Sequence, residues 1–184
     1  MYKKLIVITL IIVSLTRTQL VAAQQEAGQS ARLLTYSEDQ LSPVDANVYQ
    51  LKRKVIRQVL AKYNSPLLNS ADTFVDVCLK YNLNCYLLPA ISGVESTYGR
   101  FILPDSYNPF GWGGGYMMFR NWSEAIDTVG KGLRTNYIDK GATTISQIGR
   151  IYAPPSTTWA SRVEFFVKRF YNEEQKVQNV KDLL

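Results

Sequence analysis

The chain of 184 residues contains no histidine and only two cysteines. The absence of histidine excludes hydrolases that depend on Ser-His-Asp or Cys-His groups, because these need an imidazole base. Two cysteines without a histidine also exclude an ordinary structural zinc site, which takes four such ligands. We therefore expect no metal and no cofactor. Any chemistry has to come from carboxylates, tyrosines or backbone groups.

The sequence also lacks a dense run of basic residues. Its formal net charge is +6, from 21 Lys and Arg against 15 Asp and Glu. Lys3, Lys4 and Arg17 fall within residues 1–23, so the rest of the chain carries a net charge of only +3. This mild excess does not indicate a nucleic-acid-binding protein, although it is compatible with an anionic cell-wall polymer as partner.

The longest hydrophobic run lies at the N-terminus. "MYKKLIVITLIIVSL" joins a basic start to an apolar stretch, and "VAAQQ" follows with small residues at Val21 and Ala23. This order is typical of a secretory signal peptide over residues 1–23. An uncleaved membrane anchor is the alternative, but Arg17 interrupts the run and leaves it short for a span. We expect cleavage, and hence a secreted or extracytoplasmic protein without membrane contact.

The two cysteines, Cys78 and Cys85, are close in the sequence. In an exported protein an even pair indicates a disulfide, here between the end of one predicted helix and the loop before the next. Two buried free thiols are the alternative interpretation.

The spacing of apolar residues predicts an all-α domain over residues 44–184, after a polar linker at 24–43. Helical periodicity, caps and stop signals indicate helices within 44–63, 69–82, 86–99, 121–141, 143–153 and 154–177. Asn121 with Glu124, and Thr144 with Gln147, have the spacing of capping boxes, and the apolar stripe of the helix within 121–141 ends at Tyr137. Residues 100–120 are rich in Gly, Pro and aromatics and predict a long loop, with at most a small hairpin around the glycines. A loop of this length inside a compact domain usually carries function.

Glu95 is the unexpected residue of the third predicted helix. On a helical wheel it falls between Leu88 and Ile91, inside the apolar arc, while Gly93 on the other side would let another backbone approach. Apolar surroundings would raise the pKa of the carboxyl and keep it protonated near neutral pH. A glycosidase general acid needs this property to protonate the leaving sugar oxygen. A structural carboxylate in a cap or salt bridge is the alternative.

Aromatic residues are concentrated directly after this helix. Residues 98–122 hold eight of the 22 aromatics of the chain, where the average composition predicts about three. Aromatic faces stack on sugar rings, so several of these side chains, Trp112 and Tyr116 among them, are expected to contact a glycan. About half of the group, including Phe110 and Trp122, is expected to pack against the core.

Four segments, in order, carry a resemblance to a known family: "ISGVESTYG", "YNPFGWGGG", "FRNWSEAIDTV" and "IGRIYAPPSTTWASRV". Together they resemble the bacterial peptidoglycan glucosaminidases (mannosyl-glycoprotein endo-beta-N-acetylglucosaminidase-like domains) of the lysozyme-like superfamily, over residues 68–172. The Glu-Ser-x-x-Gly element at 95–99 also resembles soluble lytic transglycosylases and goose-type lysozymes. The resemblance implies a helical bundle of the α+β lysozyme-like type around a central catalytic helix. It further implies a peptidoglycan glycan strand as substrate, and we expect a monomer.

The resemblance also implies roles for individual residues. Glu95 matches the general acid, which would cleave the β-1,4 bond between N-acetylglucosamine and N-acetylmuramic acid, and Tyr152 matches a tyrosine that faces the catalytic centre. With the aromatic pattern, it indicates glycan-binding positions at Ser96, Tyr98, Asn108, Phe110, Gly111, Trp112, Tyr116 and Trp159. Trp159 stands where the family often has tyrosine, so only its aromatic character is carried over.

The sequence departs from the family in its second acid. Many glucosaminidases have an acidic residue in the hairpin after Asn-x-Phe-Gly, but "GWGGGYMMFRN" contains none. The nearest candidates are Asp105 and Glu124, which are also a turn residue and a helix-cap residue by pattern. With one carboxylate, either a group of the substrate attacks or an ordered water does. Hydrolysis, lytic transglycosylation and a non-catalytic glycan-binding module therefore all remain open.

Overall fold

The computed structural model describes residues 43–181, so the predicted signal peptide and the linker up to residue 42 lie outside the described residues. The helices are α2 (Pro43–Lys62), α3 (Ala71–Lys80), α4 (Leu87–Ser96), α5 (Trp122–Gly132), α6 (Ile145–Tyr152) and α7 (Trp159–Lys181). Short helical turns stand before α3 (η1, Leu68–Ser70) and after α5 (η2, Leu133–Tyr137, and η3, Ile138–Lys140). No strand occurs within the described range, which confirms the all-α prediction and makes residues 100–120 a loop without a hairpin.

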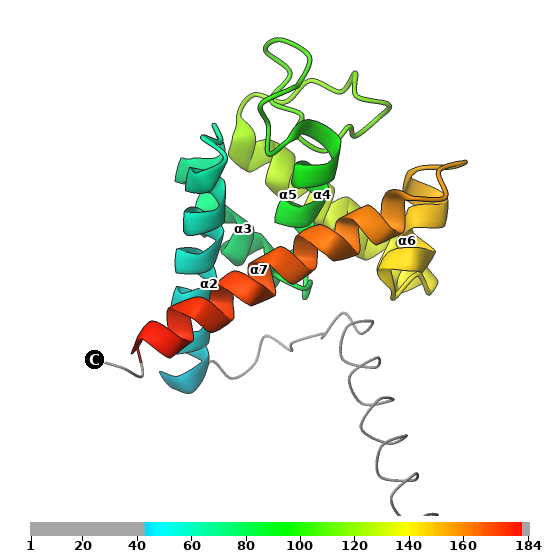
Figure 1. Cartoon of the computed structure of the whole chain (residues 1–184). Helices are drawn as coiled ribbons and strands as arrows, with labels where there is room; N and C mark the ends of the chain where they lie inside the picture. Colours follow the sequence, from blue (N-terminus) through cyan, green and yellow to red (C-terminus); the bar gives the residue numbers. More distant parts are fainter. Residues whose placement is uncertain (1–42, 182–184) are drawn as a thin grey trace, which may run out of the picture. The chain divides into compact units, whose positions relative to one another are not determined.

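Helix α4 is the central element of the described part of the chain. It contacts both α7 and α5, while α7 runs on to contact α6 at one end and α2 at the other (Figure 1). Of its ten residues, eight are buried and Val94 is half-buried. Glu95 alone is exposed. A helix that is apolar on all sides is buried on all sides, so α4 reaches solvent only in its last turn.

This burial pattern corrects the expectation for Glu95. Leu88 and Ile91 are fully buried, as the helical wheel predicts, but Glu95 does not share their buried surface. The helical wheel placed Glu95 in the apolar arc because a wheel gives only the angular position of a side chain around the helix axis. The position along the axis decides here, since Glu95 lies next to the end of the helix, where the chain leaves for the loop.

Glycines bring the helices of the core close together. A Cβ atom at Gly93 would lie 2.8 Å from Cδ1 of Phe166, so a ring of α7 rests on the backbone of α4. The close approach at Gly93 is therefore made by a side chain and not by the backbone that the sequence led us to expect. A Cβ at Gly130 of α5 would collide with Cγ1 of Val77 of α3. Both glycines are fixed by packing rather than by an unusual backbone conformation.

The ends of the helices follow the predicted signals only in part. Helix α4 stops at Ser96, before the predicted stop at Gly99, because Thr97 and Tyr98 already adopt left-handed φ angles of 50° and 57°. Helix α6 begins with the predicted capping box between Thr144 and Gln147.

The start of α5 differs from the predicted capping box. Asn121 accepts the N–H of Glu124 at 2.9 Å, as predicted. In a capping box the Glu124 carboxylate would accept the main-chain N–H of Asn121. Here it accepts the main-chain N–H of Arg120 instead, one residue earlier.

The two cysteines form the predicted disulfide. Cys78 of α3 is bonded to Cys85, which lies just before α4, and their Cα atoms are 4.9 Å apart. The bond therefore ties α3 to the start of the central helix. Between residues 43 and 181, no helix combines the length and apolar character that crossing a bilayer requires.

Gly130→Ala tests the close contact between α3 and α5. We expect this substitution to lower the free energy of unfolding by about 1–3 kcal/mol through overpacking, although alanine is the better helix former. Denaturant unfolding measures the change. Thr128→Ala, at an exposed position of the same helix, is the control and should be near neutral. A Gly130→Ala variant as stable as the control would contradict the packing described here.

Candidate active site

The carboxyl group of Glu95 lies between α7 and the 100–120 loop. Its Oε1 accepts a hydrogen bond of 2.6 Å from Nε1 of Trp159. Its Oε2 faces the backbone of Gly111, where an added Cβ would stand 3.1 Å away. Gly111 also has a φ of +61°, which a residue with a side chain rarely adopts. A glycine is therefore needed at position 111 for two reasons: the backbone has a positive φ angle, and the Glu95 carboxyl leaves little room for a side chain.

Burial raises the pKa of Glu95 above its usual value near 4.5. The hydrogen bond from Trp159 and the positive charge of Arg162 lower this pKa in turn, without cancelling the effect of burial. The side chain as a whole is exposed, but protein atoms flank its carboxyl group, and the carboxyl's own surroundings govern its titration. Glu95 thus keeps its proton at a higher pH than an ordinary glutamate.

Four aromatic rings pack against one another beside Glu95 in a cluster that we call the aromatic wall: Trp112, Tyr137, Tyr152 and Trp159. Tyr152 stacks on Trp159 with ring centroids 4.8 Å apart. Trp112 and Tyr137 lie 5.7 and 6.1 Å from Tyr152. The wall brings together the loop, η2, α6 and α7, and so joins three predicted site residues to one that was not predicted.

The sequence did not identify Tyr137 as a site residue. It stands at the end of the apolar stripe of the helix predicted within 121–141, and such a position indicates a core residue. The structure has a π-helical turn at η2 in place of the last α-helical turn. Such turns occur often at functional sites, because they redirect side chains. The residue that accompanies this turn is Gly132, just before η2. In the structure an added Cβ at Gly132 would stand 2.5 Å from Cζ2 of Trp112, so the glycine makes room for that ring.

Tyr152 keeps its hydroxyl proton. Burial, and then the negative charge of Glu95, raise the pKa of Tyr152 well above its usual value. The hydroxyl donates a 2.6 Å hydrogen bond to the carbonyl of Phe110. A tyrosine in this state cannot serve as a base at neutral pH, but it fixes the loop against α6.

Asn108 and Phe110 hold the loop from inside. The amide of Asn108 donates to the carbonyls of Trp112 (2.8 Å) and Met117 (3.1 Å) and accepts the N–H of Trp112 (3.0 Å). Phe110 is fully buried in the core. Both residues therefore contribute to the site by shaping the loop, not through an exposed side chain.

Ser96 and Tyr98, two predicted glycan-binding residues, face the interior. The Ser96 hydroxyl donates to the carbonyl of Pro109 at 2.7 Å and accepts the N–H of Gly99 at 2.8 Å. The Tyr98 ring is 0% exposed and packs edge-on against Phe166. Protein atoms enclose both side chains in this structure, and Ser96 of the Glu-Ser-x-x-Gly element fixes the end of α4. Tyr116, by contrast, is 80% exposed on the loop.

Neither candidate for a second acid acts on Glu95. The side-chain and main-chain N–H groups of Arg120 donate hydrogen bonds to the Glu124 carboxylate and hold the pKa of Glu124 below its usual value, which fits a role at the start of α5. Asp105 lies exposed in a turn with a φ of 59°. Among the described residues, the groups that shift the pKa of Glu95 are Trp159 and Arg162, and neither is an acid.

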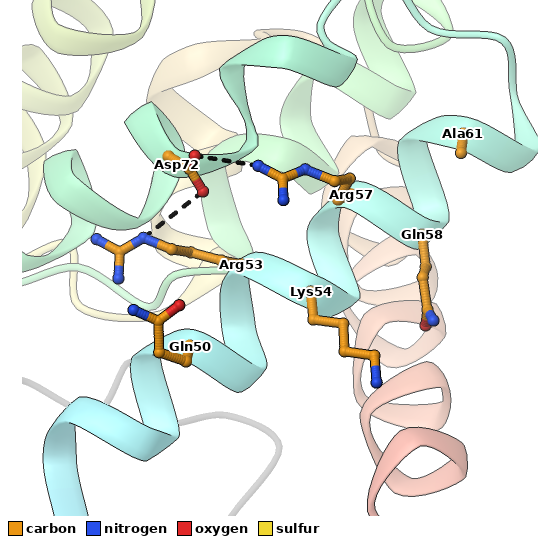
Figure 2. Close-up of a pocket in the computed structure, with 7 residues that line it drawn as sticks. All are labelled: Gln50, Arg53, Lys54, Arg57, Gln58, Ala61 and Asp72. Atoms are coloured by element: carbon orange, nitrogen blue, oxygen red, sulfur yellow. Dashed lines mark hydrogen bonds and ion pairs between the residues drawn. The ribbon is translucent and has the colours of Figure 1, made fainter. Parts of the chain in front are cut away.

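A hollow that does not include Glu95 is lined by residues of α2 and by Asp72 of α3 (Figure 2). Arg53 and Arg57 both point to Asp72 of α3, with nitrogen–oxygen distances of 3.7 and 3.0 Å. Arg53 is also paired with Asp76. Because acidic partners neutralise these two cations, this part of the hollow has the character of a helix–helix contact.

No protein-family model matches the chain, and no curated protein matches it either. Solved structures are similar, however. A catalytic mutant of S. aureus autolysin E, with glutamate replaced by alanine and in complex with the disaccharide NAG-NAM, matches with a TM-score of 0.58 and 19% identity over 66% of this chain and 67% of that one. Unliganded autolysin E gives 0.58 and 20% over 66% of each chain.

A third structure, autolysin E in complex with the muropeptide NAM-L-Ala-D-iGlu, matches over 77% of this chain and 84% of that one. Its TM-score is 0.57 and its identity 17%. At such identities the likeness shows the fold. The chain therefore shares the fold of autolysin E over the matched part, in agreement with the fold class that its sequence predicted.

The raised pKa of Glu95 predicts a pH-dependent difference in stability between wild type and Glu95→Gln. Folded wild type holds the proton more tightly than the unfolded chain, so its stability falls as the pH rises from about 4.5 through the folded-state pKa. Glutamine cannot ionise and escapes this loss. We expect the variant to gain stability relative to wild type between about pH 4 and pH 8, in denaturant unfolding. A difference that stays constant or shrinks with pH would contradict the raised pKa.

Proposed function

We propose that the chain is a glycoside hydrolase that cleaves the glycan strand of peptidoglycan, at the β-1,4 bond between N-acetylglucosamine and N-acetylmuramic acid. One observation carries the proposal. Glu95 is the one exposed residue of the otherwise buried helix α4, the pKa of its carboxyl is raised, and the carboxyl lies against Trp159 of the aromatic wall. The fold supports it, since autolysin E is described with NAG-NAM and with a muropeptide.

Glu95 acts as the general acid in this proposal. Its protonated carboxyl gives a proton to the glycosidic oxygen as the bond from that oxygen to C1 breaks, and the bonding electrons stay with the oxygen. The leaving sugar departs as an alcohol, and Glu95 becomes a carboxylate. A nucleophile then bonds to C1 and releases its proton, which returns Glu95 to the acid form.

The aromatic wall provides the binding surface for the sugar chain. Trp112 and Tyr137 are half-buried, so each ring is supported from behind while part of its surface remains accessible. Sugar C–H groups pack well on such rings. Tyr116, which is exposed on the same loop as Trp112, is a further aromatic side chain that is available to a glycan.

Lytic transglycosylation is the second candidate, and the absence of an acid near Glu95 favours it. The pKa of Glu95 responds to Trp159 and Arg162 but to no other carboxylate of residues 43–181. An inverting mechanism with a second carboxylate as base is therefore unsupported. If a sugar hydroxyl attacks C1, the product carries an internal anhydro bond. If water attacks, the product has a new reducing end.

The N-terminal pattern fits this function. Peptidoglycan lies outside the cytoplasmic membrane, and residues 1–23 have the order of a secretory signal. We propose an extracytoplasmic location, and a disulfide between Cys78 and Cys85 that is stable in that compartment.

Glu95→Gln tests the catalytic assignment. We expect product release from purified peptidoglycan to fall at least about 100-fold, because glutamine has no proton to give. Glu164→Gln removes an exposed acid of α7 and should leave the rate unchanged. Mass spectrometry of the digest measures the rate and separates reducing ends from anhydro products. Equal release by wild type and Glu95→Gln would reject Glu95, and saturable binding without any product would indicate a non-catalytic module.

The pH profile of wild type gives a separate prediction. Since Glu95 must be protonated, kcat/KM should fall on the alkaline side, with a limb above the usual carboxyl range because burial raises the pKa of Glu95. The profile is measured on soluble glycan fragments. A limb at the pKa of an ordinary exposed glutamate would contradict this account.

A further inference from the structure

Within residues 43–181, Trp159 makes the one hydrogen bond to the Glu95 carboxyl group, at 2.6 Å from Nε1 to Oε1. An indole N–H can only donate, so Oε1 has to act as an acceptor. When the carboxyl is protonated, its carbonyl oxygen is the better acceptor, so this hydrogen bond favours Oε1 as the carbonyl oxygen and Oε2 as the oxygen that carries the proton. Oε2 is the oxygen that faces Gly111 and the loop.

The surroundings of Trp159 hold its ring in place. The side chain is 4% exposed and lies stacked on Tyr152. On the α6 side, a Cβ at Gly149 would stand 2.9 Å from Cε3 of Trp159, so the ring rests on backbone. The main-chain N–H of Trp159 donates to the hydroxyl of Ser156 at 3.1 Å. Backbone and ring are thus both fixed before any substrate binds.

The other groups around Glu95 cannot replace this contact. Arg162, one turn further along α7, acts on Glu95 through its charge and donates to the carbonyl of Val94 at 3.3 Å. From α6, Tyr152 gives its proton to Phe110 and not to Glu95. Gly111 contributes only backbone from the loop.

We infer that Trp159 is a positioning residue that selects Oε2 of Glu95 as the proton-donating oxygen and stabilises the carboxylate as it forms. As the proton leaves Oε2 for the glycosidic oxygen, negative charge spreads over both carboxyl oxygens. The indole N–H then strengthens its hydrogen bond to Oε1, since bonds to charged acceptors are stronger than bonds to neutral ones. This inference rests on the proposed function, because it assigns a direction to the same proton transfer.

Trp159→Phe removes the donor and keeps an aromatic ring on Tyr152. We expect kcat on soluble glycan to fall about tenfold at low pH, where Glu95 is protonated in both proteins, while KM stays within about twofold. The pKa of Glu95, measured by NMR of its labelled carboxyl carbon, should rise, because the hydrogen bond that favours the charged form is lost. The alkaline limb of the pH profile should move upward with it.

Two further variants separate this role from a structural one. Replacing Trp159 with its benzothiophene analogue keeps the size of the ring and exchanges only N–H for sulfur, so it should reproduce both effects in a folded protein. Trp122→Phe changes a tryptophan that packs on Tyr107, away from Glu95, and should leave the pKa of Glu95 unchanged.

The outcomes are distinct. An unchanged pKa of Glu95 in the benzothiophene variant overturns the inference, and so does a loss confined to KM. If wild type releases no product from peptidoglycan, the proposed function fails by itself. The NMR titration still decides in that case whether Trp159 controls the protonation of Glu95.

Discussion

The burial of α4 is the constraint on which the rest of the structure depends. A helix enclosed by α5, α7 and the loop can reach solvent at few points, and Glu95 is the one residue of α4 that is exposed. Close packing at Gly93 brings α7 down onto α4, and this brings Trp159 to the carboxyl. The contacts that build the core therefore also position the acid. A substitution that shifts α7 on α4 should therefore also shift Trp159 relative to the Glu95 carboxyl.

Periodicity and local signals predicted most of the helices from the sequence, because each helix has an apolar stripe or a capping signal of its own. The capping box of α6 and the disulfide followed from short-range patterns. The end of α4 did not, since two non-glycine residues adopt left-handed conformations that contacts distant in the sequence support, among them the bond from Ser65 to the carbonyl of Tyr98.

Residue identity was a weaker guide to the site than to the fold. Glu95 could be found from its place in an apolar helix, but Ser96 and Tyr98, its neighbours in the motif, turn inward. Whether a side chain faces the core or the solvent depends on the path of the loop, and a pattern without spatial coordinates cannot determine that path. Tyr137 joined the site for the same reason, through a π-helical turn that ordinary helical spacing does not indicate.

The account rests on a glycan strand that lies across the aromatic wall with its scissile oxygen at Glu95. The most direct test is a crystal structure of Glu95→Gln with a NAG-NAM oligosaccharide. We predict that the glycosidic oxygen lies within about 3 Å of the residue-95 side chain, on the side that faces Gly111. Sugar rings should lie against Trp112 and Tyr137. A glycan bound elsewhere, for example in the hollow beside Arg53 and Arg57, would contradict the account.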